Sequence, residues 1–187
     1  PLFCSPTALQ RLFHHEGERA TAGAAAKFGT MFGVSSLGTV SLEELRKIYN
    51  TPQVYQFYFH KDRALNQVMM ERAKAAGVDV MMLTVDSITG GNRERDLRNG
   101  FSIPFRLTLS GMLQFAFKPM WGINYVTHES FKLPQLDDHV EMSGGALSIG
   151  RYFTEMLEPS MNWDDVAEMV KLWDGQFCLK GVMSVED

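Results

Sequence analysis

Hydrophobic residues recur along this chain in two patterns, which together predict alternating strands and helices. Short apolar runs bounded by polar residues or glycine are typical of buried strands. Such runs occupy residues 2–5, 31–35, 54–59, 78–85 and 177–180. Between them, apolar residues three or four positions apart predict helices in the ranges 17–28, 42–49, 65–76 and 163–173. Repeated strand-helix units imply a parallel sheet covered by helices.

Local signals support several of these boundaries. Ser41, with Glu44 three residues on, has the pattern of a capping box, and Gly29 follows the Ala-rich helix where it should end. One helix is expected to bury a face made of Leu65, Val68, Met69, Ala73 and Ala76. The range from about 97 to about 160 has no clear period, so we expect a long irregular excursion after the fourth strand.

The last residues also carry a signal. Residues 184–187 read as a helix N-cap followed by acidic residues of a first turn. A fifth parallel strand at 177–180 would moreover be left with an open edge. We therefore expect the chain to be a fragment of a longer barrel.

Composition narrows the class of protein. The chain has 187 residues, 45% of them hydrophobic, and a net charge of −4, so it has no basic excess of the kind that nucleic-acid binding requires. No apolar run reaches the roughly 18 residues of a membrane span. Cys4 and Cys178 lie in strand-like runs and are interpreted as small buried thiols, which favours a reducing, cytoplasmic compartment. We expect no metal site.

The richest candidate for chemistry is the stretch that ends the fourth predicted strand. The run 80–86 finishes in Thr84 and Asp86, and a glycine turn then leads into a charged loop with Arg93, Arg95 and Arg98. Guanidinium groups at a strand end suit an anionic ligand, because they bind carboxylate or phosphate through paired hydrogen bonds. The alternative is a solvated loop with internal Arg–Glu and Arg–Asp pairs, and charge alone favours that alternative.

Six motifs along the chain weigh against the interpretation of a merely solvated loop. They are Ser5-Pro6-Thr7-Ala8, Ser35-Ser36, Gln56 to Arg63, Leu83-Thr84-Val85-Asp86, Arg93 to Gly100 and Leu179-Lys180-Gly181-Val182. In this order the chain resembles the FMN-dependent α-hydroxy acid dehydrogenases and oxidases, a family that includes L-lactate dehydrogenase, glycolate oxidase and mandelate dehydrogenase. The resemblance implies an α/β fold, a (β/α)8 TIM barrel, of which residues 1–187 cover about strands 1 to 5.

The resemblance also implies roles in binding FMN at the strand ends. Residues Pro6, Thr7 and Ala8 would approach the flavin mainly through backbone atoms, and Ser35, Gln56 and Thr84 would hydrogen-bond the edge of its ring system. Lys180 would stabilise the anionic reduced ring. Without the resemblance, Ser35 and Thr84 would be interpreted as satisfying backbone groups at strand ends, and Lys180 as an ordinary strand-end lysine.

Substrate contacts are implied for two residues. Arg93 would bind the substrate carboxylate, and the Tyr58 hydroxyl would bind the carboxylate or the hydroxyl that is oxidised; periodicity alone fits a half-buried strand aromatic at Tyr58 equally well. None of the five histidines matches the proton-abstracting histidine of the family, and we assign His14 a structural role. Leu37 stands where glycolate-type oxidases carry Trp, which implies a different substrate pocket.

The expected function is therefore oxidation of an L-2-hydroxy acid, lactate-like, to the 2-oxo acid by hydride transfer to FMN. The residues 1–187 alone are expected to be inactive, and the complete enzyme is expected to form a homo-oligomer. The electron acceptor would be oxygen, a quinone or a cytochrome. Two alternatives remain: another FMN barrel enzyme such as a type 2 isopentenyl diphosphate isomerase, and a non-catalytic protein, either a truncated remnant or a half-barrel interaction module.

The apolar segment 111–136 has three interpretations. It contains Phe115, Phe117, Trp121 and Tyr125 with few charged residues. Some bacterial members of the family attach to the membrane through this loop, which would place the protein peripherally on the inner face of the cell membrane. A lid over the active site or a buried excursion fits the pattern equally well.

Overall fold

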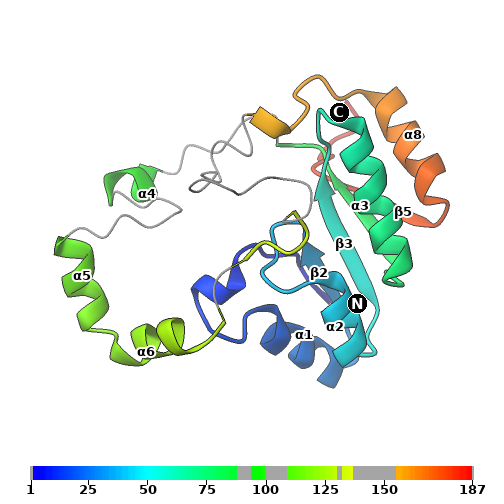
Figure 1. Ribbon diagram of the computed structural model, residues 1–187. Helices are drawn as coiled ribbons and strands as arrows, with labels where there is room; N and C mark the ends of the chain where they lie inside the picture. Colours follow the sequence, from blue (N-terminus) through cyan, green and yellow to red (C-terminus); the bar gives the residue numbers. More distant parts are fainter. Residues whose placement is uncertain (1, 88–93, 100–108, 130–131, 137–154, 187) are drawn as a thin grey trace.

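The chain folds around a five-stranded parallel sheet (Figure 1). The computed structural model describes residues 2–87, 94–99, 109–129, 132–136 and 155–186. The strands are β1 (Phe3–Cys4), β2 (Met31–Ser35), β3 (Gln53–Tyr58), β4 (Val80–Thr84) and β5 (Gln176–Lys180). Neighbours in the sheet follow the order of the chain, and every pairing is parallel. The predicted parallel sheet is confirmed.

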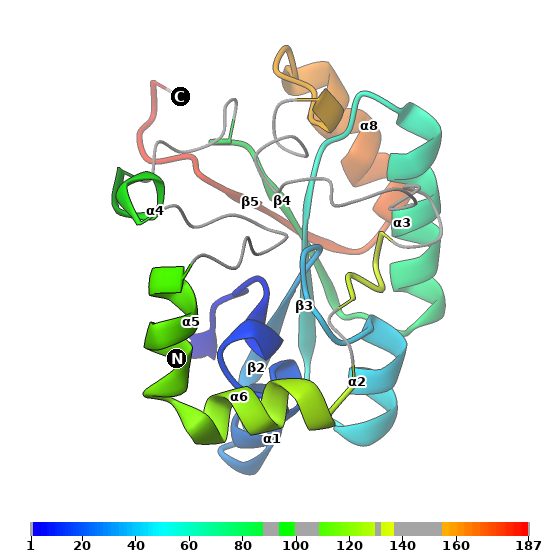
Figure 2. The same ribbon diagram turned by 60° about the vertical axis from the view of Figure 1, so that its left-hand side comes forward.

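One face of the sheet is covered by helices, as Figure 2 shows. They are α1 (Glu18–Lys27), α2 (Leu42–Ile48), α3 (Arg63–Ala75) and α8 (Trp163–Trp173). Each of the last three begins at a polar N-cap whose side chain accepts backbone N–H bonds: Ser41, Asp62 and Asn162. Such caps satisfy donors that the first helical turn leaves unpaired. The sequence therefore fixes where three of the four covering helices start.

The core lies between this helical layer and the sheet. Strand positions Val34, Tyr55 and Met81 stand side by side in the register and are fully buried. Ala22 and Ala25 are buried on α1, where their small side chains let the helix lie close to β2. Burial on both faces explains why these strands read as apolar runs instead of alternating patterns.

Some boundaries differ from the prediction for identifiable reasons. β4 starts at Val80 and not at Val78, because Gly77, with φ of 75°, ends α3 and the Val78 N–H bonds back to the Ala73 carbonyl. Val68 was expected on the buried face of α3, but it is 36% exposed, whereas Met70 is buried. Residues 184–186 do not form the helical turn that was expected there.

The excursion after β4 is more regular than expected. It contains α4 (Glu94–Arg98), α5 (Leu109–Ala116) and α6 (Pro119–Thr127). We call α5 and α6 the apolar hairpin; it stands away from the sheet on the side opposite α3 and α8 (Figure 1). Both helices are strongly apolar on average, and a short apolar segment cannot be assigned to a helix or a strand from its sequence alone, so neither was predicted.

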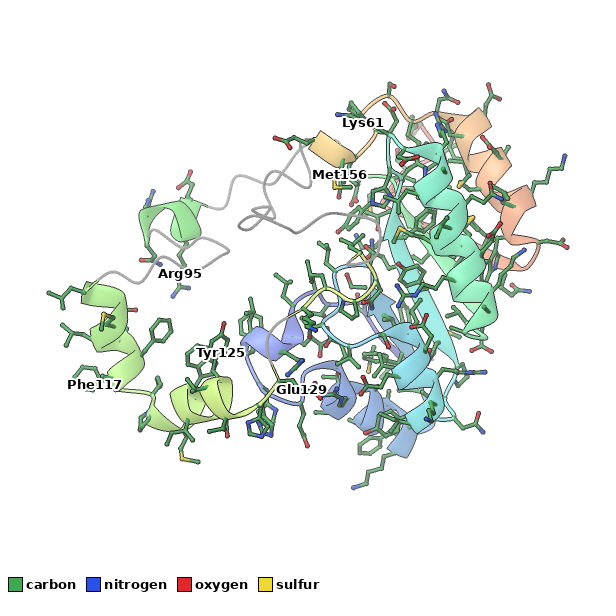
Figure 3. The ribbon with its side chains drawn as sticks, viewed as in Figure 1. Lys61, Arg95, Phe117, Tyr125, Glu129 and Met156 are labelled. Carbon is green, nitrogen blue, oxygen red and sulfur yellow. The ribbon has the colours of Figure 1, made fainter. Side chains whose placement is uncertain are left out.

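The return of the excursion to the sheet is a short antiparallel contact. His60, just after β3, pairs with Leu157, and two backbone bonds flank the bridge: Lys61 N–H to the Met156 carbonyl at 2.9 Å and Glu158 N–H to the Phe59 carbonyl at 3.0 Å. Figure 3 shows Lys61 and Met156 close together at this point. The segment 155–158 thereby lies against the carboxyl end of β3.

Candidate functional site

The predicted cofactor and substrate residues of the strands come together at one end of the sheet. Ser35 pairs in register with Gln56, which places both in one row across β2 and β3. Tyr58, Thr84 and Lys180 form the next row, across β3, β4 and β5. Because residues two apart on a strand point to the same face, Gln56 and Tyr58 share a face. Five of the predicted residues therefore lie on one face at the carboxyl ends of the strands.

Three of these side chains form a buried hydrogen-bonded chain. The Ser35 hydroxyl donates to Gln56 Oε1 at 3.2 Å, and Gln56 Nε2 donates to Thr84 Oγ1 at 2.8 Å. All three residues are almost fully buried. Ser35 Oγ also accepts from the Leu37 N–H at 3.2 Å, so the backbone interpretation of Ser35 holds as well. The chain fixes the rotamers of polar groups that would otherwise be costly to bury.

The first strand delivers its predicted residues to the same end. Pro6, Thr7 and Ala8 follow β1 after Ser5, and the Thr7 carbonyl accepts from Gln10 Nε2 at 3.2 Å. Pro6 lies against Gly33 so closely that a Cβ there would stand 2.7 Å from the Pro6 nitrogen. Only glycine therefore lets the turn after β1 approach β2 at this point.

The cation at the end of β5 has an acidic neighbour that the sequence reasoning did not select. Lys180 Nζ lies 3.9 Å from Asp86 Oδ1, and both side chains are about half exposed. Gly181, with φ of 120°, leaves room for Asp86, because a Cβ at this position would lie 2.6 Å from the Asp86 Cβ. The Thr-Val-Asp ending of β4 was the available signal for Asp86, but the strand pairing that brings it to Lys180 could not be read from it.

The charged loop after β4 is described only in part. Arg93 lies outside the described residues, so its predicted contact with a carboxylate stays a prediction. Arg95 and Arg98 lie in α4, and Arg98 donates to the Glu94 carboxylate at 2.8 Å. This exposed pair spans one helical turn and matches the interpretation of internal Arg–Glu pairs in a solvated loop.

A small cavity adjoins the strand ends. It measures about 70 Å³, and its walls include Tyr58, Thr84 and Val85 from the strands and Leu157 and Met161 from the returning segment. A cavity of this size can hold a chemical group of a few non-hydrogen atoms. The return of the excursion thus helps to form the wall next to Tyr58.

The four described histidines lie elsewhere. His60 is buried, its backbone N–H and its Nδ1 both contact Asn66 Oδ1, and burial lowers its pKa to about 4. His14, His15 and His128 gather where the apolar hairpin meets the segment before α1. None of these four rings lines the cavity beside Tyr58.

The two cysteines differ somewhat from the expectation. Cys4 and Cys178 are both free, as predicted, but both are half-buried instead of fully buried, because β1 and β5 are the outer strands of the sheet. Burial raises the pKa of the Cys178 thiol. Within the described ranges, no group of three His, Cys, Asp or Glu residues has the geometry to hold a metal ion.

Sequentially ordered parallel strands, a single helical layer and polar strand ends define the wall of a (β/α)8 barrel. Residues 1–187 match the family of FMN-dependent dehydrogenases over their whole length, and the chain belongs to this family. The predicted fold class and family are therefore confirmed.

Individual relatives agree. The chain is 37% identical to an L-lactate oxidase of Nostoc sp. and 31% identical to an (S)-mandelate dehydrogenase of Pseudomonas putida, in each case over its full length and 47% of the relative. The crystal structure of the monotopic membrane protein (S)-mandelate dehydrogenase matches with a TM-score of 0.88 at 29% identity, over the full chain and 49% of that protein. The chain thus spans about half the length of the proteins that it matches.

FMN is the cofactor of this family, as predicted. The residues present fit a planar ring with polar edges. Among the described residues, the hydrogen bonds given above leave the Thr84 hydroxyl hydrogen and the second Gln56 amide hydrogen available as donors. The ammonium group of Lys180 adds a cation in the neighbouring row.

Proposed function

We propose that this chain forms the flavin-holding part of an enzyme that oxidises an L-2-hydroxy acid to the 2-oxo acid. The observation that carries the proposal is the pair of rows at the strand ends, which sets buried hydrogen-bonding groups beside a tyrosine and a lysine. The names of the relatives, L-lactate oxidase and (S)-mandelate dehydrogenase, support a 2-hydroxy acid as substrate.

In this proposal the buried chain orients the cofactor. Ser35, Gln56 and Thr84 would hold the polar edge of the flavin, and their mutual hydrogen bonds mean that no reorganisation is needed when it binds. The residues after β1, Pro6 to Ala8, would lie against the ring through backbone. When bound, FMN supplies the acceptor for the two electrons and the hydrogen that leave the substrate.

Lys180 and Tyr58, which lie in the same row as Thr84, would take part in the reaction. The Lys180 ammonium would stabilise the negative charge that develops on the flavin when it is reduced, and Asp86, 3.9 Å away, would help to orient that ammonium. The Tyr58 hydroxyl would donate to the substrate from the wall of the small cavity. Arg93 would bind the carboxylate. Since no described histidine lines this cavity, we expect residues 1–187 alone not to turn over.

The test compares two arginines in the complete enzyme with flavin bound, since residues 1–187 alone are not expected to turn over. Arg93→Lys should lower kcat/KM for L-lactate and longer L-2-hydroxy acids by about tenfold or more, because a lysine cannot form the paired bonds to a carboxylate. Flavin absorbance should be unchanged. Arg95→Lys, two residues away in α4, is the matched control and should leave kcat/KM nearly unaltered.

Two results would count against the proposal. Equal kinetics of Arg93→Lys and the unaltered enzyme would remove Arg93 from the site. A flavin-loaded enzyme whose absorbance is not bleached anaerobically by any L-2-hydroxy acid would exclude the reaction itself. Repeating the assay in air, with a quinone and with a cytochrome then identifies the electron acceptor.

A second proposal concerns the apolar hairpin. Between Leu109 and Thr127 the sequence has one charged residue, Lys118, and Phe117 and Val126 are 82% and 81% exposed. Figure 3 shows Phe117 at the outer end of the hairpin. Apolar surface exposed on this scale usually meets a partner. Among the described residues, no helix has both the length and the apolar composition to cross a bilayer.

We propose that the hairpin rests on a membrane surface at the inner, cytoplasmic face. The support is its exposed apolar side chains together with the likeness to (S)-mandelate dehydrogenase, which is described as a monotopic membrane protein. The double substitution Phe117→Ser and Val126→Ser should weaken co-sedimentation with phosphatidylglycerol vesicles by about tenfold or more. Phe28→Ser, at an 80% exposed residue after α1, is the control and should bind like the unaltered protein. Equal binding of all three would contradict the proposal.

A further inference from the structure

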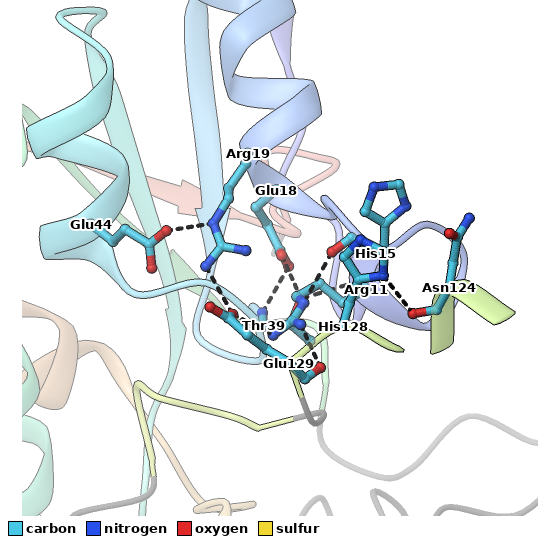
Figure 4. Close-up of polar contacts among 9 residues, drawn as sticks. All are labelled: Arg11, His15, Glu18, Arg19, Thr39, Glu44, Asn124, His128 and Glu129. Carbon is cyan, nitrogen blue, oxygen red and sulfur yellow. Dashed lines mark hydrogen bonds and ion pairs between the residues drawn. The ribbon is translucent and has the colours of Figure 1, made fainter. Parts of the chain in front are cut away.

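Three imidazole rings stand in a row where the apolar hairpin joins the rest of the molecule. The centroid of the His15 ring lies 4.4 Å from that of His14 and 4.2 Å from that of His128. His14 and His15 precede α1, whereas His128 directly follows α6. The row therefore connects two segments that are far apart in the sequence, and Figure 4 shows His15 and His128 at their meeting point.

The surroundings of the His14 and His15 rings favour uncharged imidazole. His14 Nδ1 accepts the Glu16 backbone N–H at 3.3 Å, which it can do only while that nitrogen carries no proton. His15 Nδ1 is buried and has no hydrogen-bond partner among the described residues. A proton on this nitrogen would be buried without an acceptor, which is unfavourable. His128 Nδ1 lies 2.9 Å from the Asn124 carbonyl, a contact that both charge states allow.

Two acids near the row, Glu16 and Glu129, favour a positive charge on it, but Glu129 is already shared between two guanidinium groups. Arg11 is the nearest cation: its side chain is 7% exposed, its Nε donates to the His15 carbonyl at 3.2 Å, and its Nη1 lies 3.4 Å from Glu129 Oε2. Glu129 is shared with Arg19 at 3.1 Å. Its carboxylate is thus already paired with two guanidinium groups, as Figure 4 shows.

Two further acidic groups near the row, Glu18 and Glu44, are also already paired. Glu18 is taken by Thr39, to which both carboxylate oxygens are hydrogen-bonded, and Glu44 pairs with Arg19. Glu16 is the one acid that favours a charged His15. Against it, burial and then His128, His14 and Arg11 lower the pKa of His15. Tyr125 also borders the row.

The row of imidazoles lies where the apolar hairpin is attached to the rest of the molecule. Trp121 Nε1 of α6 donates to the Leu12 carbonyl at 2.9 Å, and Glu129, two residues after α6, pairs with Arg11 and with Arg19 of α1. A cavity of about 230 Å³ is lined by all three imidazoles, so water and protons reach them. A change of charge in the row therefore acts where α6 is held.

We propose that the His14–His15–His128 row is a pH-sensitive fastening of the apolar hairpin: neutral rings stack and hold α6 against the segment before α1, and acid charges them so that they repel and α6 detaches. Histidine in an unfolded chain titrates near pH 6.5. Because the folded state binds a proton at His15 less readily, the detached state takes up more protons. The fastening is thus complete above about pH 6.5 and is lost as the pH falls below it.

Hydrogen–deuterium exchange of the full chain tests this without membrane or turnover, so its outcome is independent of both functions proposed above. Exchange of peptides from 119–129, corrected for the intrinsic effect of pH and divided by that of α3 peptides, is compared at about pH 7.5 and about pH 5.5. We expect the ratio to rise by about threefold or more in acid.

Variants connect the effect to the row. His15→Phe keeps an aromatic ring in the stack but cannot take up a proton, and His128→Gln removes a charge from the other segment; each should lose most of the acid response. Lys118→Gln changes the charge at the opposite end of α6 and should respond like the unaltered chain. A ratio that does not change with pH, or the same acid response in His15→Phe and His128→Gln as in the unaltered chain, would overturn the proposal.

Discussion

The barrel wall and the apolar hairpin use similar side chains in opposite ways. In the wall, which comprises the sheet with α1, α2, α3 and α8, residues such as Phe57 and Leu83 are fully buried. In the hairpin, Leu109 and Phe117 are largely exposed, and the stacked rings of Phe115, Trp121 and Tyr125 join α5 to α6. The wall obtains its stability from burial within the chain, whereas the hairpin keeps its apolar surface available for something else.

The largest expected difference comes from truncating one phenylalanine in each region. Phe57→Ala should lower the free energy of unfolding by about 3–5 kcal/mol, because it removes buried contacts and leaves a cavity. Phe117→Ala should change it by less than about 0.5 kcal/mol. Urea denaturation of the full chain, followed by circular dichroism, measures both. Similar losses for the two variants would show that the hairpin is buried in solution.

Acid should affect the two regions at different pH values. His60 belongs to the wall, and burial lowers its pKa to about 4. Because this pKa lies below that of an unfolded histidine, stability is intact above about pH 6.5 and declines as the pH falls toward 4, by up to about 3 kcal/mol.

Unfolding experiments across this pH range check the size of the effect. His60→Gln should flatten the dependence of stability on pH, while exchange of the hairpin still responds near pH 6. Loss of stability of the wall and of exchange protection of the hairpin at the same pH would contradict this expectation.

A smaller difference is expected at helix starts. Asn162→Ala should cost about 1 kcal/mol of stability, since Asn162 Oδ1 accepts the N–H groups of Asp164 and Asp165 in a capping box. Lys118→Ala, at the N-cap of α6, should cost close to nothing, because its side chain makes no capping bond. Thermal unfolding compares the two. Equal costs would mean that capping does not distinguish the wall from the hairpin.

The wall was also the part that the sequence predicted well. β2 was predicted at its observed bounds, because an apolar run between a glycine turn and Ser35 is a local signal. The family resemblance implied a shared role for Ser35, Gln56 and Thr84, and the sheet brings them together because parallel strands end at the same edge. Local patterns suffice where the chain repeats one structural unit.

The rest depended on contacts between distant segments. Asp86 became a site residue only when β5 brought Lys180 next to it. The row of imidazoles joins residue 15 to residue 128, and nothing in either neighbourhood predicts the other. The burial of Asn66 in place of Val68 arises because the Asn66 side chain bonds the His60 backbone, a tertiary effect that helical periodicity does not contain.

The sequential order of the strands has a consequence for how the chain reaches this structure. About 20 residues connect β2 to β3 and β3 to β4, whereas about 90 connect β4 to β5, so closing the last pairing costs about 1 kcal/mol more in chain entropy. Contacts between nearby residues also tend to form faster than distant ones. The first four strands should assemble early and β5 should join late. Lys180 would then reach the strand ends last, after Ser35, Gln56 and Thr84 have formed their hydrogen bonds. The site would therefore lack the charge of this lysine until folding is nearly complete.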